Sequence, residues 1–216
     1  ISPDGKMLAF TAQYEGPTEV YTMPISGGAP TRRTWDSGRI THVGWTPERR
    51  LLVSTDADST LPNQQLATID LETHTRPRVP LAQAADGIYL SEGTLIFTRL
   101  PFQGSQCKRY QGGTAQQLWR FKAGEPEATP LTTDYNGTSK NPMSVGERVF
   151  FLSDRSGTMN LWSMTSAGKD VKQHTKHEGF DIISARAQGT SIAYQQKAEV
   201  HLFNTVDSTD KILEIK

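Results

Sequence analysis

Arg148-Val-Phe-Phe-Leu152 and Asn160-Leu-Trp-Ser-Met164 are two short apolar runs on either side of the turn Asp154-Arg-Ser-Gly157, and this stretch decides the fold. Short runs rich in β-branched, aromatic and aliphatic residues around a glycine turn are typical of two antiparallel strands. The same strand, turn and strand pattern occurs five times along the chain. The protein is therefore predicted to be a repeat protein made of small β-sheets.

The five copies share a first strand that follows a polar or glycine turn and a second strand that returns. The first strands are predicted at Lys6–Phe10, Arg50–Val53, Gly93–Phe97, Arg148–Leu152 and Ser191–Tyr194. The return strands are predicted at Glu19–Met23, Gln65–Ile69, Gln117–Phe121, Asn160–Met164 and Glu199–Phe203. Every return strand begins with a polar residue followed by an aliphatic one. The aliphatic positions recur after about 46, 52, 43 and 39 residues, a period typical of four-stranded propeller blades.

Each copy also has room for an inner and an outer strand. Ile40–Gly44 and Asp181–Ser184 are examples of inner segments, and Arg32–Thr34 and Val171–His174 are examples of polar outer ones. Four strands a unit, arranged in a ring, leave few exposed sheet edges. We therefore predict an all-β propeller of four-stranded blades, with about five blades in these 216 residues. We expect the large rings of Tyr21, Trp119 and Trp162 to pack between neighbouring blades.

Composition excludes several function classes. Lys plus Arg and Asp plus Glu both number 23, so the formal net charge is zero and predicts no nucleic-acid partner. No apolar run approaches the ~20 residues that a membrane-spanning helix needs. The single cysteine, Cys107, permits neither an intrachain disulfide nor a thiolate metal cluster. We interpret Cys107 as an incidental residue of a loop.

The sequence predicts no catalytic residue, no metal site and no cofactor. Of the five histidines, only His174 and His177 look like a pair, and a spacing of three in a strand directs two rings to opposite sides. Asp154–Gly157 and Asp56–Asp58 lack the later acidic ligands of a calcium loop, so we interpret both as turns. Neither a nucleophile elbow nor a phosphate-binding loop is present.

Several motifs resemble the six-bladed propeller of the tricorn protease family. The signature Lys108-Arg-Tyr-Gln-Gly-Gly-Thr114 comes at the end of an insertion from Pro101 to Gly113 and is followed by the strand residues Gln117-Leu-Trp-Arg120. Further similar stretches are Leu52–Ala57, Val149–Asp154 with Gly157, and Gly168–Asp170 with His174 and Thr175. The resemblance covers nearly the whole chain and places the insertion in the corresponding blade.

The resemblance implies that residues 1–216 are a fragment of one propeller domain, six-bladed in the parent. The first blade would be missing and the second incomplete at the N-terminus. Tricorn-like proteases are cytosolic serine peptidases that trim oligopeptides and assemble as hexamers. Their catalytic domains would lie outside this chain, so no catalytic residue is carried over. Expected partners are oligopeptide substrates or products and other domains of the same chain.

In that family the propeller is viewed as a channel that admits or releases peptides and excludes folded proteins. The walls of such a channel are the innermost strands of the blades. The candidate channel-lining residues are His42, Tyr89, Met143 and Ile182. Because side chains alternate along a strand, only every second residue of each inner strand faces the channel, and either half fits the pattern.

Two other interpretations share the turns and the repeat. One is a TolB-like periplasmic scaffold that binds a protein partner, which the signature at residues 108–114 disfavours. The other is the propeller cap of a prolyl-oligopeptidase-like hydrolase, which usually has seven blades. The sequence downstream of Lys216 would distinguish them: a PDZ-like module with a Ser/His peptidase, termination of the chain, or an α/β-hydrolase elbow.

Overall fold

The structure is a computed structural model that describes residues 1–35, 38–60, 63–101 and 108–214. Within these ranges the regular secondary structure consists of β-strands and contains no helix, which confirms the all-β prediction. The described residues therefore contain no helix that is long and apolar enough to cross a membrane. The chain divides into two compact units, residues 1–101 and 102–216, and each is described by itself.

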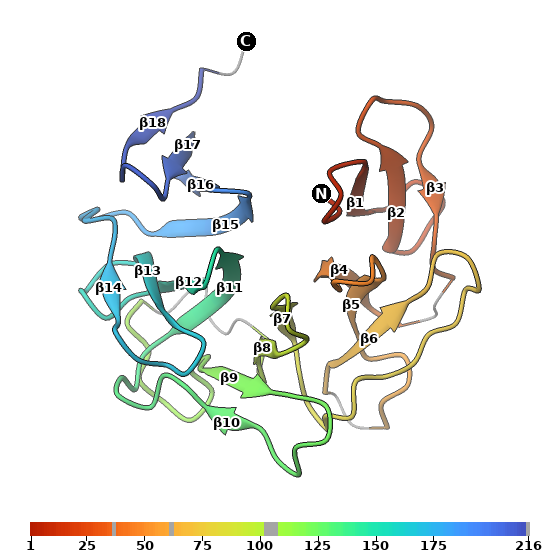
Figure 1. Cartoon of the computed structure of the whole chain (residues 1–216), viewed down its shortest axis with the longest axis horizontal. Coiled ribbons are helices and arrows are strands. Elements are labelled where there is room, and N and C mark those ends of the chain that lie inside the picture. The colour runs from red at the N-terminus through yellow and green to blue at the C-terminus, as the bar shows by residue number, and fades with distance from the viewer. Residues whose placement is uncertain (36–37, 61–62, 102–107, 215–216) are drawn as a thin grey trace. The chain divides into compact units, whose positions relative to one another are not determined.

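The first unit contains eight strands among its described residues. They are β1 (Met7–Ala12), β2 (Glu19–Pro24), β3 (Thr31–Arg32), β4 (Ile40–Trp45), β5 (Leu51–Thr55), β6 (Gln65–Ile69), β7 (Asp86–Tyr89) and β8 (Leu95–Thr98). β1, β2 and β3 form an antiparallel sheet, and so do β4, β5 and β6 (Figure 1). β7 pairs with β8, and the innermost strand β4 packs beside both β1 and β7.

The second unit begins with the antiparallel pair β9 (Leu118–Phe121) and β10 (Thr129–Pro130). Two four-stranded sheets follow, each in simple sequence order (Figure 1). Their strands are β11 (Ser139–Val145), β12 (Arg148–Ser153), β13 (Asn160–Thr165) and β14 (Lys172–Gln173), then β15 (Ile182–Gln188), β16 (Ser191–Gln196), β17 (Glu199–Asn204) and β18 (Asp210–Ile212). Sheets that follow one another in this order are the blades of a propeller.

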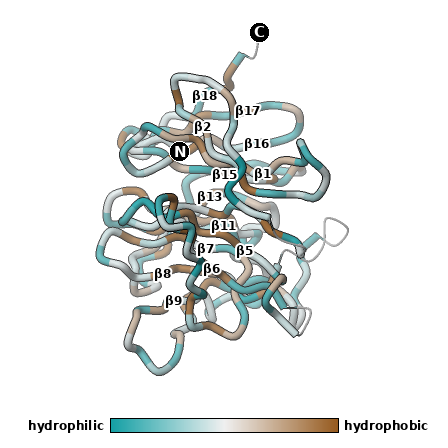
Figure 2. The backbone as a smooth tube through the Cα atoms, turned by 90° about the vertical axis from the view of Figure 1, so that its right-hand side faces the viewer, coloured by the Kyte–Doolittle hydropathy of each residue, from teal (hydrophilic) through white to brown (hydrophobic). Residues whose placement is uncertain are grey.

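Each unit has its own hydrophobic core between neighbouring sheets. In the first unit the core joins residues of β1, β2, β4, β5 and β6, including Val20, Ile40 and Leu51, all fully buried. In the second unit it joins β11–β13 to β15–β17, and Leu161 and Ile192 are fully buried there. Figure 2 shows hydrophobic colours concentrated on the strands and hydrophilic colours on many connecting loops. β5 is buried along its whole length because its sheet lies between those that begin with β1 and β7.

One backbone hydrogen bond recurs in all five repeats. The carbonyl of the aliphatic residue in each return strand accepts a hydrogen bond from the N–H thirteen residues later, at 2.8–2.9 Å. The donor and acceptor pairs are Arg33 and Val20, Val79 and Leu66, Leu131 and Leu118, His174 and Leu161, and Leu213 and Val200. The outer segment of every repeat therefore joins the return strand at the same point. This explains why the distance in sequence from return strand to outer segment is constant, although the repeats differ in length.

A threonine completes this junction in three repeats. The N–H of Val20, Leu118 and Leu161 donates to the hydroxyl of a threonine fourteen residues later, at 2.9–3.0 Å. These threonine hydroxyls donate in turn to the polar residue that begins the return strand: Thr34 to Glu19, Thr132 to Gln117, and Thr175 to Asn160. The polar first position of the sequence pattern is thus an acceptor that orients the threonine.

The three large rings expected between blades differ in burial. Tyr21 is buried, with 3% of its surface exposed, whereas Trp119 and Trp162 are only partly covered. Trp162 instead lies under Arg155, whose guanidinium carbon is 5.3 Å from the ring centroid. Arg155 comes from the Asp154–Gly157 turn and also lies over the ring of Phe151. Trp162 thus has a cation from its own blade over its ring, whereas the sequence pattern predicted contact with a neighbouring blade.

We predict that Thr175→Val lowers the free energy of unfolding by about 1–3 kcal/mol, because the shape is kept while the buried Leu161 N–H loses its acceptor. Urea denaturation measures the change. Thr129→Val is the matched control, since Thr129 is exposed on β10 and the loss there should stay within about 0.5 kcal/mol. Equal losses in both variants would contradict this role for the threonine.

Candidate functional site

The innermost strands carry the four residues predicted to line a channel. His42 lies in β4 and is partly buried, with its ring 6.0 Å from that of Trp45. Its backbone N–H donates to the Thr11 hydroxyl of β1 at 3.0 Å, which holds β4 to the neighbouring sheet. Tyr89 ends β7 and is partly exposed. Burial of the phenol raises the pKa of Tyr89 above its usual value, and nearby Glu48 adds to the rise, so Tyr89 stays neutral at physiological pH.

Met143 and Ile182 are core residues of the second unit. They are 3% and 1% exposed and belong to the cluster that joins the two four-stranded sheets. Their strand neighbours take the other side: Ser144 is exposed, and Ile183 has 53% of its surface exposed. Ser144 and Ile183 are therefore exposed positions of the inner strands, as are Ser184 and Arg186 of β15.

A side-chain hydrogen bond holds the two inner strands of this unit together. The Asn141 carbonyl oxygen in β11 accepts from the backbone N–H of Ala185 in β15 at 2.8 Å. Asn141 is buried and has a positive φ of 55°, which asparagine tolerates better than most residues. It sits where the pairing of β11 with β12 shifts, between Lys140 and Met143. The irregularity frees Asn141 from the regular ladder and directs its amide to the next sheet.

The end of the insertion contacts the turns of the second unit. Arg109 donates from Nε to the Gly157 carbonyl at 2.7 Å, and Lys108 donates to the Gly179 carbonyl at 3.0 Å. The Lys108 ammonium also pairs with Asp181 at 3.6 Å. These contacts fix the residues of the signature beside the starts of β13 and β15. Cys107 and the earlier part of the insertion, residues 102–107, lie outside the described residues.

A charged pocket lies in the first unit, lined by residues that include Ser2, Trp45 and Glu72. Its arginines are already paired, Arg49 with Asp4 at 3.1 Å and Arg50 with Asp70 at 3.4 Å. The hydroxyl of Ser2, the Lys6 N–H and Arg49 lower the pKa of Asp4 to about 2. The pocket is a set of surface ion pairs, and such pairs contribute little to stability.

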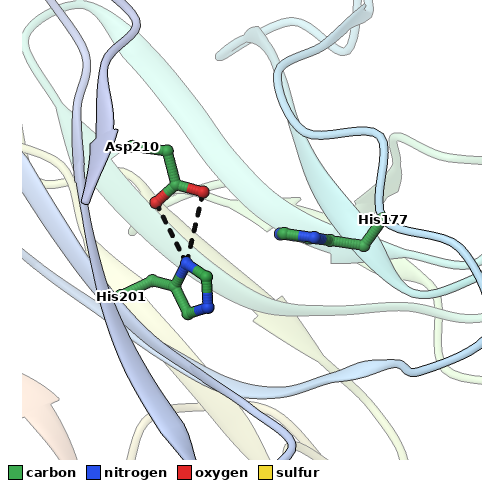
Figure 3. A group of neighbouring side chains, drawn as sticks. All are labelled: His177, His201 and Asp210. Atoms are coloured by element: carbon green, nitrogen blue, oxygen red, sulfur yellow. Dashed lines mark hydrogen bonds and ion pairs between the residues drawn. The ribbon is translucent and has the colours of Figure 1, made fainter. Parts of the chain in front are cut away.

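His177, His201 and Asp210 form a second polar cluster, all within the second unit (Figure 3). His177 comes from the segment before β15, His201 from β17, and Asp210 from β18. Their potential ligand atoms lie within 4.8 Å of one another. Figure 3 shows His177 pointing towards the other two, and His201 Nδ1 is 3.3 Å from both carboxylate oxygens of Asp210.

Tyr194 of β16 places its hydroxyl among these three groups. The hydroxyl donates to Asp210 Oδ2 at 2.5 Å and lies 2.8 Å from His177 Nε2 and 3.2 Å from His201 Nδ1. Its ring stacks on that of His201, which faces it directly across the strand pair. Burial and the hydrogen bond to Asp210 raise the pKa of Tyr194, and burial lowers the pKa of His177. Both groups are therefore neutral at pH 7.

His174 and His177 contact different residues, although they are three positions apart. His174 Nε2 is 2.7 Å from the Ser163 hydroxyl, and its ring packs against Phe150 and Phe203. His177 meets Tyr194 and His201 instead. The sequence analysis considered this pair and missed His201 and Asp210. The only sequence feature that could have indicated the cluster is that His201 and Asp210 fall in adjacent predicted strands of one repeat. The two side chains come together only when β17 pairs with β18.

Strand order, sheet pairing and repeat spacing define the chain as a β-propeller of four-stranded blades. Residues 1–209 match the family model of the tricorn protease N-terminal beta propeller domain, and the chain belongs to this family. It is 31% identical over 212 residues to tricorn protease homolog 1 of Streptomyces coelicolor, and 25% identical over 226 residues to tricorn protease of Thermoplasma acidophilum. These alignments cover 97% and 99% of the chain but only 20% of each relative, so the chain spans about a fifth of their length.

Solved structures agree on the fold. A crystal structure of the tricorn protease matches 99% of the chain and 22% of its own with a TM-score of 0.87 at 21% identity. TolB from Acinetobacter baumannii matches 97% of the chain and 52% of its own with a TM-score of 0.73 at 16% identity. At these identities the likenesses show the fold alone. The prediction of a tricorn-type propeller with a five-bladed arrangement is confirmed by the family match and the higher structural similarity.

We predict that lowering the pH from 7.5 to about 5.5 destabilises the second unit partly through His174. Burial, with Arg148 and Lys172 nearby, lowers the pKa of His174 from the ordinary 6.5, so the unfolded chain binds more protons in this range. Stability therefore falls as the pH drops through 6.5. Urea denaturation at both pH values should show a smaller fall in His174→Asn. His74→Asn, at an exposed histidine, is the control, and its fall should equal that of the unchanged protein.

Proposed function

We propose that the chain is the non-catalytic access domain of a tricorn-like serine protease. In this proposal the propeller filters or channels oligopeptides to or from a catalytic chamber built by other parts of the parent protein. The observation that carries the proposal is the family match over residues 1–209, together with relatives named tricorn protease that are about five times longer. A propeller suits this task because its inner strands are rigid and pore size limits what passes.

The surface of β11 and β15 supports the proposal. Their exposed residues include Ser144, Ile183 and Ser184, which are small or apolar and uncharged. These uncharged positions present no fixed charge that a peptide must match, whereas the exposed Arg186 of β15 would attract acidic side chains. The buried Asn141 amide keeps β11 and β15 aligned, so the surface stays in place when a peptide touches it. Assembly as a hexamer and a cytoplasmic location belong to the same proposal, with a periplasmic location as the alternative.

The proposal is tested by comparing the full-length parent with residues 1–216 alone on fluorogenic oligopeptides. We expect hydrolysis by the parent and none by the propeller chain. Gel filtration of the parent reports the assembly in the same preparation. A parent that is inert towards every peptide would overturn the protease proposal and favour a binding scaffold.

A variant tests the channelling step separately. Ile183→Trp in the full-length parent adds bulk at an exposed inner-strand position, and we predict that it lowers kcat/KM for long peptides by roughly tenfold, about 1.4 kcal/mol in the barrier. Dipeptide substrates should be affected much less. Ile25→Trp is the matched control, because Ile25 is also 53% exposed but follows β2 in a turn. Equal kinetics for the two variants with long peptides would argue against passage along β15.

A further inference from the structure

The cluster of His177, His201 and Asp210 has no part in the proposed access function. It joins three segments of the second unit: the segment before β15, strand β17 and the outermost strand β18. Two imidazoles and a carboxylate are a donor set that suits zinc and similar divalent ions. We propose that His177 Nε2, His201 Nδ1 and the Asp210 carboxylate bind a zinc ion that fastens β18 to the rest of its sheet. This departs from the sequence analysis, which predicted no metal site.

The spacing of the donor atoms fits such an ion. Tetrahedral zinc with bonds of about 2.0–2.2 Å keeps its ligand atoms roughly 3.3–3.6 Å apart. His201 Nδ1 lies 3.3 Å from the Asp210 oxygens, and the three ligand atoms lie within 4.8 Å of one another. Binding therefore requires the donor atom of His177 to approach the other two by up to about 1.5 Å. His177 is partly exposed and lies outside the strands, so it has room for this shift.

The Tyr194 hydroxyl has hydrogen-bond partners in the cluster both without and with zinc. Without zinc, its hydroxyl donates to Asp210 and accepts from the protonated ring nitrogens of the two histidines. With zinc on His177 Nε2 and His201 Nδ1, each ring proton moves to the other nitrogen of its ring, and the Tyr194 hydroxyl keeps its hydrogen bond to the carboxylate. The ion thus takes the place of the hydrogen bonds that the two ring nitrogens donate to the Tyr194 oxygen.

Glu199 lies behind His201, where metal-binding histidines usually have a hydrogen-bond partner for the ring nitrogen that does not bind the metal. His201 is buried, and its second nitrogen, Nε2, lies 3.7 Å from a carboxylate oxygen of Glu199 without a hydrogen bond. When zinc holds Nδ1, the ring proton must sit on Nε2, where it faces Glu199. A carboxylate behind a ligating histidine fixes the tautomer and makes the ring a better ligand. The lack of a hydrogen-bond partner for His201 Nε2 is an observation separate from the three donor atoms, and it also supports the zinc-bound form.

Zinc would stabilise the outer edge of this blade. β18 has only three residues, pairs with β17 alone and is exposed along its length. Asp210 begins this strand, so an ion bound there links β18 directly to the segment in front of β15. Exposure of Asp210 also leaves a path by which an ion from solvent reaches the site.

The test is zinc binding by the chain after treatment with EDTA. Calorimetric titration with zinc chloride should give one site per chain, and cobalt substituted for zinc should give the strong visible absorption of a tetrahedral ion. At zinc about a hundredfold above Kd, Tm should rise by about 5–10 °C. Asp210→Asn should weaken binding by at least tenfold, and Glu199→Gln by roughly tenfold while the stoichiometry stays at one.

Asp207→Asn is the matched control, since this exposed carboxylate lies three residues before Asp210 and accepts hydrogen bonds from Thr209. It should bind zinc like the unchanged chain. Absence of one-to-one binding, an octahedral cobalt spectrum, or equal affinity in Asp210→Asn and Asp207→Asn would overturn the proposal and leave a hydrogen-bonded network around Tyr194. If Asp210→Asn does not fold, the cobalt spectrum and stoichiometry of the unchanged chain decide.

Discussion

The structure depends on one backbone hydrogen bond that is repeated in every copy of the pattern. It joins the carbonyl of the aliphatic residue in the return strand to the N–H thirteen residues later. The outer strands β3, β10 and β14 have only two residues each, so few ladder bonds hold them. The repeated hydrogen bond therefore fixes each short outer segment at the edge of its blade. In three repeats the adjacent threonine adds a side-chain bond, which satisfies a buried N–H that the short outer strand does not reach.

This junction also explains how repeats of unequal length build the same blade. The spacing within the junction is constant, whereas the spacing between repeats varies from about 39 to 52 residues. Additional residues therefore accumulate in loops such as the insertion after Pro101, where closure entropy rises only slowly with length. The core is unaffected because it is formed by the first and return strands, whose aliphatic residues are the fixed points.

The sequence predicts the strands well because the apolar runs and turns recur in five copies, so a strand assigned in one copy can be checked against the same position in the others. It does not predict which inner-strand residues face outward. Alternation alone leaves two choices, and three inner strands contain a shift in pairing: β4 between His42 and Gly44, β11 between Lys140 and Met143, and β15 between Ile182 and Ser184. A bulge disturbs the alternation part-way along a strand. Met143 and Ile182 are in the core, although the pattern allowed them to be exposed. Likewise, the polar cluster of His177, His201 and Asp210 arises from residues up to 33 positions apart, and no local pattern marks it.

The shifts in pairing coincide with bonds between neighbouring sheets. An inner strand pairs along one edge only, so its bonds to the next inner strand come from side chains or from backbone groups outside its ladder. At the shift in β11, Asn141 leaves the ladder, adopts a positive φ and uses its amide to bind Ala185 of the next inner strand. In the first unit, Thr11 of β1 bonds the His42 N–H, beside the shift in β4. Such bonds add to the core contacts of Met143 and Ile182 in holding neighbouring inner strands together, and they do so without occupying exposed positions such as Ser144 and Ser184.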